Sequence, residues 1–262
     1  MKKLLLFALL FSSLLSVSAG AFADHSLSVR VELKEDGSAH VTEKTIFFVR
    51  PPASGEDESA DEKNFKAALA SGKSTVLEWK PFSQNIGYHV GGVSGSIENL
   101  RIAAGTEQSI SYYARFVTLD YDVTNPIVSN TQENLADPVT GISQNSGRTT
   151  RYSLGQDFLG FKKSEVGQTI LGQNTVFTIA LPTGARLVST TGTYDAGKKT
   201  VSWNGPMTVN VALSYEIEEP LSEEVYRFFS GAYQAFGQLI PLALVLGLAA
   251  VVGAVFVKFR KQ

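Results

Sequence analysis

One uninterrupted apolar segment near the end of the chain constrains its structure more than any other feature. Residues 239–257 form a run of 19 without a charged or strongly polar side chain, and a basic tail at 258–262 follows them. A helix rises about 1.5 Å per residue, so this run spans roughly the 30 Å hydrocarbon core of a bilayer. It predicts one transmembrane helix with the tail in the cytoplasm. The other interpretation is a buried soluble helix, but such helices rarely lack polar residues over about five turns.

The first 23 residues have the three-part layout of a secretory signal peptide. Two lysines precede an apolar run at 4–15, and small residues then end in Ala21-Phe22-Ala23. Ala21 and Ala23 form the A-x-A pattern of a signal-peptidase site, which predicts cleavage after Ala23. A first transmembrane span is the alternative, but serines interrupt the run, and a span needs about 20 apolar residues. The region between the two apolar segments is therefore expected outside the cytoplasm.

The region 24–238 is acidic and long enough to bury its own core. All 25 acidic residues lie in it, whereas five of the 23 basic residues lie outside it, which leaves 18 and a net charge near minus seven. That charge argues against binding a phosphate backbone, so no nucleic-acid partner is predicted. The chain has no cysteine, which excludes disulfides, zinc–thiolate sites and iron–sulfur clusters.

Alternating apolar and polar residues predict strands along most of the exported region. Residues 27–33 form the first, Asp36-Gly37 suits a tight hairpin turn, and 39–49 form the second. A short helix at 60–70 is expected to present Phe65, Ala68 and Leu69 on one side. Further strands are predicted at 75–79, 97–102, 108–123, 177–181, 187–191, 200–203 and 207–217. In the long strand 108–123, one face is expected to hold Ile110, Tyr112, Ala114 and Phe116.

Short strands separated by Gly, Pro and Asn turns, with little helix, predict a mainly β fold. The expected architecture is an antiparallel β-sandwich-like ectodomain plus one C-terminal transmembrane helix. Residues 24–219 are taken as one domain because no low-complexity linker divides them, and two subdomains divided near residue 165 are the alternative. Residues 124–168 show weak periodicity, which indicates either a functional loop region or elements that periodicity does not find.

Residues 220–238 are predicted to form a juxtamembrane helix, with Ser222 as its N-cap. It either lies in the membrane interface or extends the transmembrane helix upward. Within the span, small residues recur at spacings of four, three and four, and they let another helix approach closely. This stripe consists of Ala243, Gly247, Ala250 and Ala254. It favours lateral helix association in the membrane.

Local motifs for chemistry are missing from the sequence. His25, His40 and His89 are the three histidines, and no pair has the spacing of metal ligands. The acidic run 56–62 lacks the spacing and the glycine of a calcium loop, so it predicts a solvated loop. We therefore predict no catalytic residue, no cofactor, no metal ligand and no enzymatic activity. A serine–histidine–acid site assembled from distant positions is the alternative, because such sites are defined by geometry.

The first hairpin, 28–43, joins an Asp36-Gly37 turn to the sequence Val41-Thr42-Glu43. In these features it resembles the opening of uncharacterised prokaryotic membrane-anchored protein families, which start with a signal peptide and an exported N-terminal β domain. The resemblance covers 16 residues. It implies an extracytoplasmic β domain and implies no activity and no functional residue.

Together these features predict a single-pass membrane protein with its N-terminal domain outside the cytoplasm and its tail inside. The expected role is a cell-envelope binding or structural module that presents the β domain to an envelope protein or a glycan. One alternative is an accessory subunit of a membrane complex that associates through its transmembrane helix. A second alternative is an exported hydrolase with a non-local active site.

Overall fold

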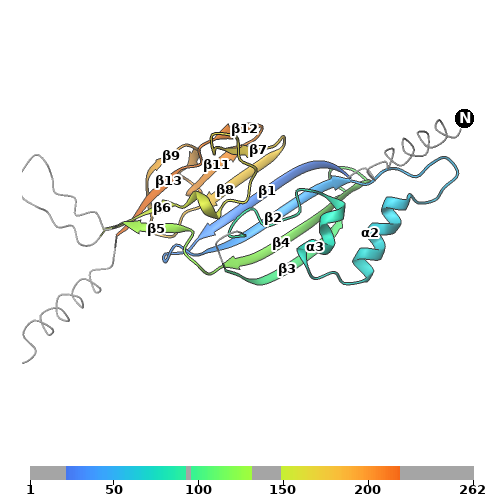
Figure 1. The fold of residues 1–262 in the computed structure, drawn as a ribbon, viewed down its shortest axis with the longest axis horizontal. Helices are drawn as coiled ribbons and strands as arrows, with labels where there is room; N and C mark the ends of the chain where they lie inside the picture. Colours follow the sequence, from blue (N-terminus) through green and yellow to red (C-terminus); the bar gives the residue numbers. More distant parts are fainter. Residues whose placement is uncertain (1–21, 93–95, 132–148, 219–262) are drawn as a thin grey trace, which may run out of the picture. The chain divides into compact units, whose positions relative to one another are not determined.

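The computed structural model describes residues 22–92, 96–131 and 149–218 (Figure 1). Most of the predicted signal peptide, including Ala21, lies outside these ranges. The predicted juxtamembrane helix, transmembrane helix and basic tail also lie outside them. The same holds for the small-residue stripe Ala243, Gly247, Ala250 and Ala254. Within the described ranges, no helix has the length and apolarity needed to cross a membrane. The chain divides into two compact units, and nearly all described residues belong to the first, which combines the described parts of 22–131 with 151–216.

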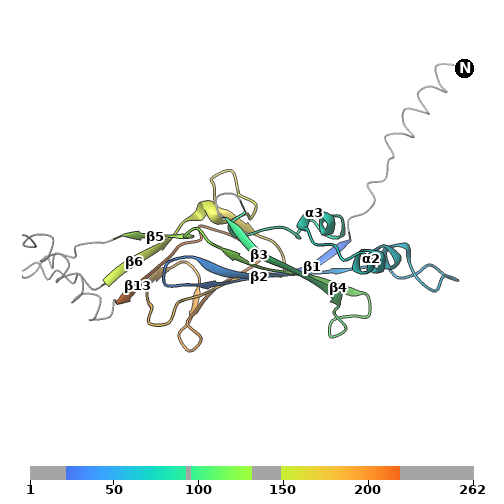
Figure 2. The same ribbon diagram turned by 90° about the horizontal axis from the view of Figure 1, so that it is seen from below.

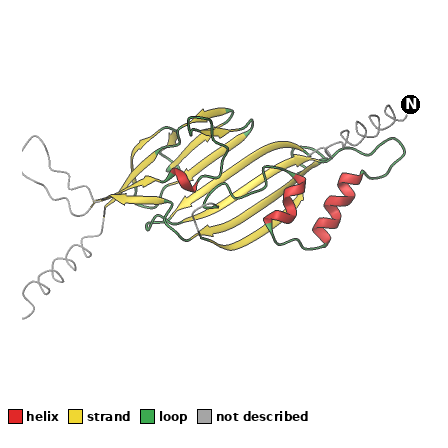
Figure 3. Cartoon of the chain, in the orientation of Figure 1, coloured by secondary structure: helices red, strands yellow, loops and turns green. Residues whose placement is uncertain are grey.

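A seven-stranded sheet is the largest element of this unit (Figure 3). In spatial order its strands are β10 (Thr193–Asp195), β11 (Thr200–Asn204), β8 (Thr175–Ala180), β1 (Ala23–Leu33), β2 (Ala39–Phe48), β4 (Ala114–Val123) and β3 (Ile97–Thr106). Its neighbours pair antiparallel except β1 and β8, which run parallel. The prediction of a mainly β fold is confirmed. The sheet is mixed rather than purely antiparallel, because periodicity predicts strands but not which distant strand joins the first hairpin.

Two smaller sheets contain the remaining strands. The four-stranded sheet has the order β5 (Val128–Thr131), β6 (Thr149–Leu154), β13 (Leu213–Glu218) and β9 (Arg186–Thr190), and β12 (Met207–Val209) pairs with β7 (Thr169–Leu171). The prediction of one strand at 207–217 is therefore wrong. Its first part pairs with β7 and its last part with β9, so the chain changes partner at 210–212 although the alternation continues. The weakly periodic region 124–168 contains β5, β6 and the turn η2 (Gln156–Phe158).

Two helices and a single 3-10 turn follow β2. Helix α2 (Ala60–Ala70) has the predicted bounds, with Phe65 and Ala68 buried but Leu69 39% exposed. The predicted strand at 75–79 is wrong, because these residues form α3 (Val76–Trp79), which leads into η1 (Lys80–Phe82). A capping box starts helix α3. In it, the Glu78 carboxylate accepts hydrogen bonds from the Thr75 backbone N–H and hydroxyl.

One face of the long strands is buried. In β2 the inward residues occupy odd positions, which places the polar Glu43 and Thr45 in the core beside Phe47. Strand β4 also buries its odd positions, from Arg115 to Val123. The predicted start of the strand 108–123 is wrong, since the strand begins only at Ala114 and residues 107–113 form a turn.

The helices cover this face at the end of the sheet where β2 finishes. Figure 2 shows α3 on one side of the long strands. Ring centroids of five aromatic side chains lie 5.3–6.3 Å apart in contacting pairs, and this aromatic cluster consists of Phe22, Phe47, Phe65, Trp79 and Phe82. Offset and edge-to-face contacts of this kind stabilise a pair by about 0.5–1.5 kcal/mol beyond area burial. The cluster therefore fixes the two helices on the sheet.

Gly37 in the β1–β2 turn gives a first test of this packing. Its φ is +82°, and an added Cβ would lie 2.8 Å from Val128 Cγ2. Gly37→Ala should lower the free energy of unfolding by about 1–2 kcal/mol for the left-handed φ alone, and by more because of the contact. Gly55→Ala is the matched control, since its φ is +87° and no atom lies within 4 Å. Urea denaturation followed by tryptophan fluorescence compares them, and equal losses would contradict a close contact at Gly37.

Candidate functional site

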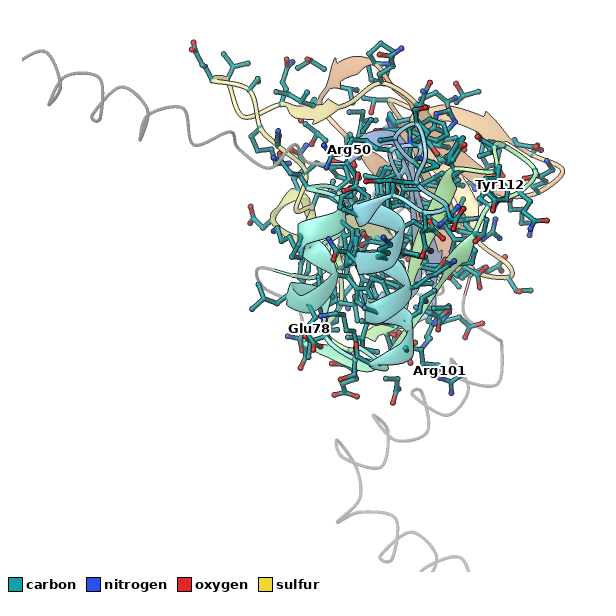
Figure 4. The ribbon with its side chains drawn as sticks, turned by 90° about the vertical axis from the view of Figure 1, so that its right-hand side faces the viewer. Arg50, Glu78, Arg101 and Tyr112 are labelled. Atoms are coloured by element: carbon teal, nitrogen blue, oxygen red, sulfur yellow. The ribbon has the colours of Figure 1, made fainter. Side chains whose placement is uncertain are left out.

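Three cavities surround α2, and Arg50 lines all of them. The α2–η1 cavity, about 660 Å³, is lined by residues that include Ala68, Lys73 and Phe82. The α2–turn cavity, about 440 Å³, includes Glu58, Lys66 and Tyr112, and the β1-end cavity, about 340 Å³, includes Phe22, Ala23 and Phe48. Figure 4 looks at this end of the molecule, with the two helices in front and Arg50 and Tyr112 labelled. Concave sites of this size are typical places for ligand binding.

Arg50 is held by a two-pronged ion pair. It lies two residues after the end of β2, and its Nε and Nη2 donate to Asp61 of α2 at 2.6 and 2.9 Å. The Arg50 backbone N–H also donates to Asp61 at 3.3 Å. Asp61 is buried, whereas the Arg50 side chain is 71% exposed. A planar guanidinium paired in this way has one orientation, so it presents its outer edge to the cavities.

The same ion pair gives a pH prediction. Hydrogen bonding from the Arg50 side chain holds the pKa of Asp61 below its ordinary value of 3.8. A lowered carboxyl pKa stabilises the fold at pH values above the ordinary pKa of the group. This contribution is lost as the pH falls through the lowered pKa of the folded state. Asp61→Asn should therefore be less stable than the parent near neutral pH, and the difference should vanish in acid. Urea midpoints measured as a function of pH test this, with the exposed Glu56→Gln as the control. A difference that persists in acid would contradict the ionic cause.

The α2–turn cavity has balanced charges. Arg115 is buried in its wall, where Nη1 donates to the carbonyl oxygens of Tyr112 and Ala114 at 2.7 and 3.0 Å and Nη2 donates to Glu62. Lys66 Nζ lies 2.6 Å from Glu58. The exposed Tyr112 ring stands at the rim. Because cations and carboxylates alternate here, this cavity fits a neutral polar or zwitterionic group better than a simple ion.

These contacts change the interpretation of the acidic run 56–62, which was predicted to be a solvated loop. Glu58, Asp61 and Glu62 each pair with a cation, namely Lys66, Arg50 and Arg115. Three carboxylates of this run therefore fix the walls of the cavities. The sequence contains little signal for the pairing partners, because Arg115 is 53 residues from Glu62 and Arg50 is separated from Asp61 by a turn with two prolines.

A buried carboxylate lies further along the same sheet face. Glu43 is 2% exposed and accepts the backbone N–H of His89 at 2.7 Å. The His89 Nδ1 lies 2.6 Å from its other oxygen, and the Tyr121 hydroxyl donates to the carboxylate while lying 2.9 Å from the Val90 carbonyl oxygen. Burial and the nearby Glu43 raise the pKa of Tyr121. This Glu43–His89–Tyr121 cluster joins β2, β4 and the chain after η1, so it positions elements rather than facing a cavity.

The structure does not bring the three histidines together. His40 lies between two carboxylates of β4, with Nδ1 3.1 Å from Asp122 and Nε2 3.3 Å from Asp120. The His25 ring instead packs on Phe48, with centroids 4.9 Å apart. In the described parts of the chain, no group of three or more His, Cys, Asp or Glu side chains is placed to hold a metal ion.

One predicted processing residue lies in the described ranges. Ala23 is the first residue of β1, and it pairs with Phe48 of β2. Its neighbour Phe22 also belongs to the fold, because its ring contacts Phe47 and Phe82. The predicted cleavage would therefore remove two residues that line the β1-end cavity.

Comparison with known proteins finds a distant structural neighbour. No known protein family and no curated protein matches the sequence. The solved NMR structure of the folded domain of LppM from Mycobacterium tuberculosis is similar over 77% of this chain and 95% of that one, at 13% sequence identity and a TM-score of 0.30. A likeness at this level carries no inference about ligand or activity, so the site must be interpreted from its own residues.

Proposed function

We propose that this chain is a membrane-anchored binding module of the cell envelope, which binds its ligand in the cavities around Arg50. The signal-peptide pattern and the apolar segment 239–257 support export and anchoring. In this proposal a β sandwich carries the site outside the cytoplasm and the C-terminal helix holds it at the membrane. The ligand is an envelope component, either protein or glycan.

The meeting of three cavities at Arg50 is the observation that carries the proposal. Arg50 is oriented by Asp61, and two of the three cavities are lined by rings of the aromatic cluster, namely Phe22 in both and Phe82 in the α2–η1 cavity. Binding sites work best when their polar groups are held by packed neighbours, because less freedom is then lost when the ligand binds. An oriented and largely exposed cation beside packed aromatic rings meets that condition.

The other two roles stay predictions. An accessory subunit would depend on the stripe Ala243, Gly247, Ala250 and Ala254, which lies outside the described residues. A hydrolase needs an accessible nucleophile beside a base. His89 contacts the buried Glu43 and His40 contacts the carboxylates of β4, and neither contact supplies such a pair.

A photocrosslinking experiment on the full chain in its own membranes tests the proposal. A photoreactive residue replaces Lys73, which lines the α2–η1 cavity, and the control replaces Lys198, which is 80% exposed on another turn. We expect an adduct at position 73 that weakens in Arg50→Glu, and none at position 198. Equal labelling at both positions, or none at 73, would contradict the site.

The same experiment separates the module from the accessory subunit. In a Gly247→Leu background, the adduct at position 73 should persist if the cavities alone select the ligand. Loss of that adduct would favour association through the helix. Protease added to intact cells should degrade the β domain, and its protection would contradict the proposed topology.

A further inference from the structure

Phe22 occupies a place of its own at the edge of the candidate site. Its ring centroid lies 5.3 Å from that of Phe82 and 5.7 Å from that of Phe47, with the second pair edge-to-face at 65°. Phe22 lines both the α2–η1 cavity and the β1-end cavity, as do Arg50 and Asp61. The ring therefore stands in the wall between these two cavities, beside an oriented guanidinium.

Cleavage after Ala23 would remove this ring from the fold. Hydrolysis of the bond between Ala23 and Asp24 takes up one water and gives a carboxylate on Ala23 and an ammonium group on Asp24. Asp24 itself would stay in place, since it pairs with Phe47 of β2 and its carboxylate accepts the Ser83 hydroxyl. The new ammonium group would then face the position that Phe22 and Ala23 had filled.

The vacated place has three chemical features. Phe47 and Phe82 form an aromatic slot, which the Phe22 ring shows to be large enough for a phenylalanine side chain. The backbone of Phe48, which Ala23 pairs with, loses its partner on the β1 side while Ala114 still pairs with it from β4. The Asp24 ammonium lies at one end of this place, and Arg50 lines the two cavities that Phe22 also lines.

We infer that the mature protein uses this place to bind the C-terminal end of an extended peptide whose penultimate residue is aromatic and whose last residue is small. The aromatic ring enters the slot of Phe22, the last residue pairs with Phe48, and the free carboxylate meets the Asp24 ammonium. Strand addition of this kind combines backbone hydrogen bonds with a side-chain pocket. The inference rests on the proposed function, and it names the ligand class for the same site.

The direction of β1 favours the C-terminal end of a peptide ligand over an internal segment of one. Phe22 and Ala23 run into Asp24 in β1, so a peptide in the same direction ends against Asp24. An internal segment would have to continue through the position that Asp24 holds. A carboxylate at this end is favoured because its charge is opposite to that of the ammonium group, whereas an amide gains only a neutral hydrogen bond.

The test uses the full chain, purified in mild detergent after normal export. Mass spectrometry of its N-terminus first shows whether Asp24 is the first residue. Fluorescence anisotropy then measures binding of a labelled peptide with the sequence of residues 17–23, which ends in Phe-Ala with a free carboxylate. We expect saturable binding, at least tenfold weaker for the peptide with serine in place of phenylalanine and also weaker for the C-terminally amidated peptide.

Two protein variants complete the design. Ala21→Leu blocks the A-x-A site and retains Phe22, so it should lose peptide binding at least tenfold. Phe82→Leu keeps an apolar residue in the slot and should weaken binding about threefold to tenfold, with an unchanged circular dichroism spectrum.

The outcomes test the peptide inference separately from the proposed function. A mature protein that still begins before Phe22, or equal binding of the phenylalanine and serine peptides, overturns the inference. Binding of a fatty acid without binding of the peptide also overturns it, because the slot would then take an acyl chain. In all three cases a crosslinked adduct at position 73 would leave the proposed function standing. Loss of that adduct would remove both the proposed function and the peptide inference.

Discussion

Glu43→Ala should lower the free energy of unfolding by about 3–5 kcal/mol, because a buried acceptor shared by several groups is lost together with its packing. The carboxylate accepts the backbone N–H of His89, faces the ring of His89 and accepts the hydroxyl of Tyr121. Alanine leaves the His89 backbone N–H without its acceptor and the His89 ring without its partner, whereas the Tyr121 hydroxyl still has the Val90 carbonyl oxygen at 2.9 Å. Each buried unpaired donor costs about 1–3 kcal/mol. The small side chain also leaves a cavity among packed neighbours.

Urea denaturation of the full chain in mild detergent measures this effect through the fluorescence of Trp79 and Trp203, the two tryptophans. Glu32→Ala is the matched control, because Glu32 belongs to the same hairpin but is 52% exposed in its pair with Arg30. It should change stability by less than about 0.5 kcal/mol. Glu43→Gln should fall between the two, since an amide keeps one acceptor oxygen. A loss in Glu43→Ala no larger than in Glu32→Ala would contradict the bracing role.

The buried cluster also shows what the sequence could indicate. The residue alternation of β2 continues from Ala39 and Val41 through Glu43 to Phe47, so period 2 alone places Glu43 on the buried face. A carboxylate at an inward position signals a buried partner. Which partner it is could not be predicted, because His89 and Tyr121 come from segments 46 and 78 residues away.

Elements defined by local chemistry were predicted best. The first hairpin, its Asp36-Gly37 turn and α2 follow from alternation, turn residues and helical spacing, and the structure confirms them. The short helix α3 was missed although Thr75 and Glu78 carry the capping-box signature. The break at 210–212 could not be seen, since the same alternation serves two strands that belong to different sheets.

The candidate site was not predicted, because its residues have meaning only in three dimensions. Arg50 follows a predicted strand and precedes two prolines, and this pattern is typical of an ordinary strand end. Its importance comes from Asp61 and from the cavities that α2 and η1 create when they pack on Phe47. Phe22 was assigned to the signal peptide alone, and only the structure shows that its ring lies in the fold.

Phe65→Ala should have the second large effect, about 3–5 kcal/mol, as expected for truncating a buried phenylalanine. Phe65 is 1% exposed, and its ring contacts those of Phe47, Trp79 and Phe82. It also lies 5.8 Å from the guanidinium carbon of Arg115. Since α2 contributes only Phe65, Asp61 and Ala68 as buried residues, losing this ring removes most of the apolar area that holds the helix on the sheet.

Phe65→Ala should also impair the candidate site around Arg50. With α2 loosened, Asp61 no longer holds Arg50 in one orientation, so the adduct at position 73 should weaken together with stability. Leu77→Ala is the control, because Leu77 is an aliphatic residue of α3 with 78% exposure, and it should leave both unchanged. Urea denaturation and crosslinking of the same preparations make the comparison. If Phe65→Ala destabilised the chain but left the adduct at full strength, the cavities around Arg50 would not be the place where the ligand binds.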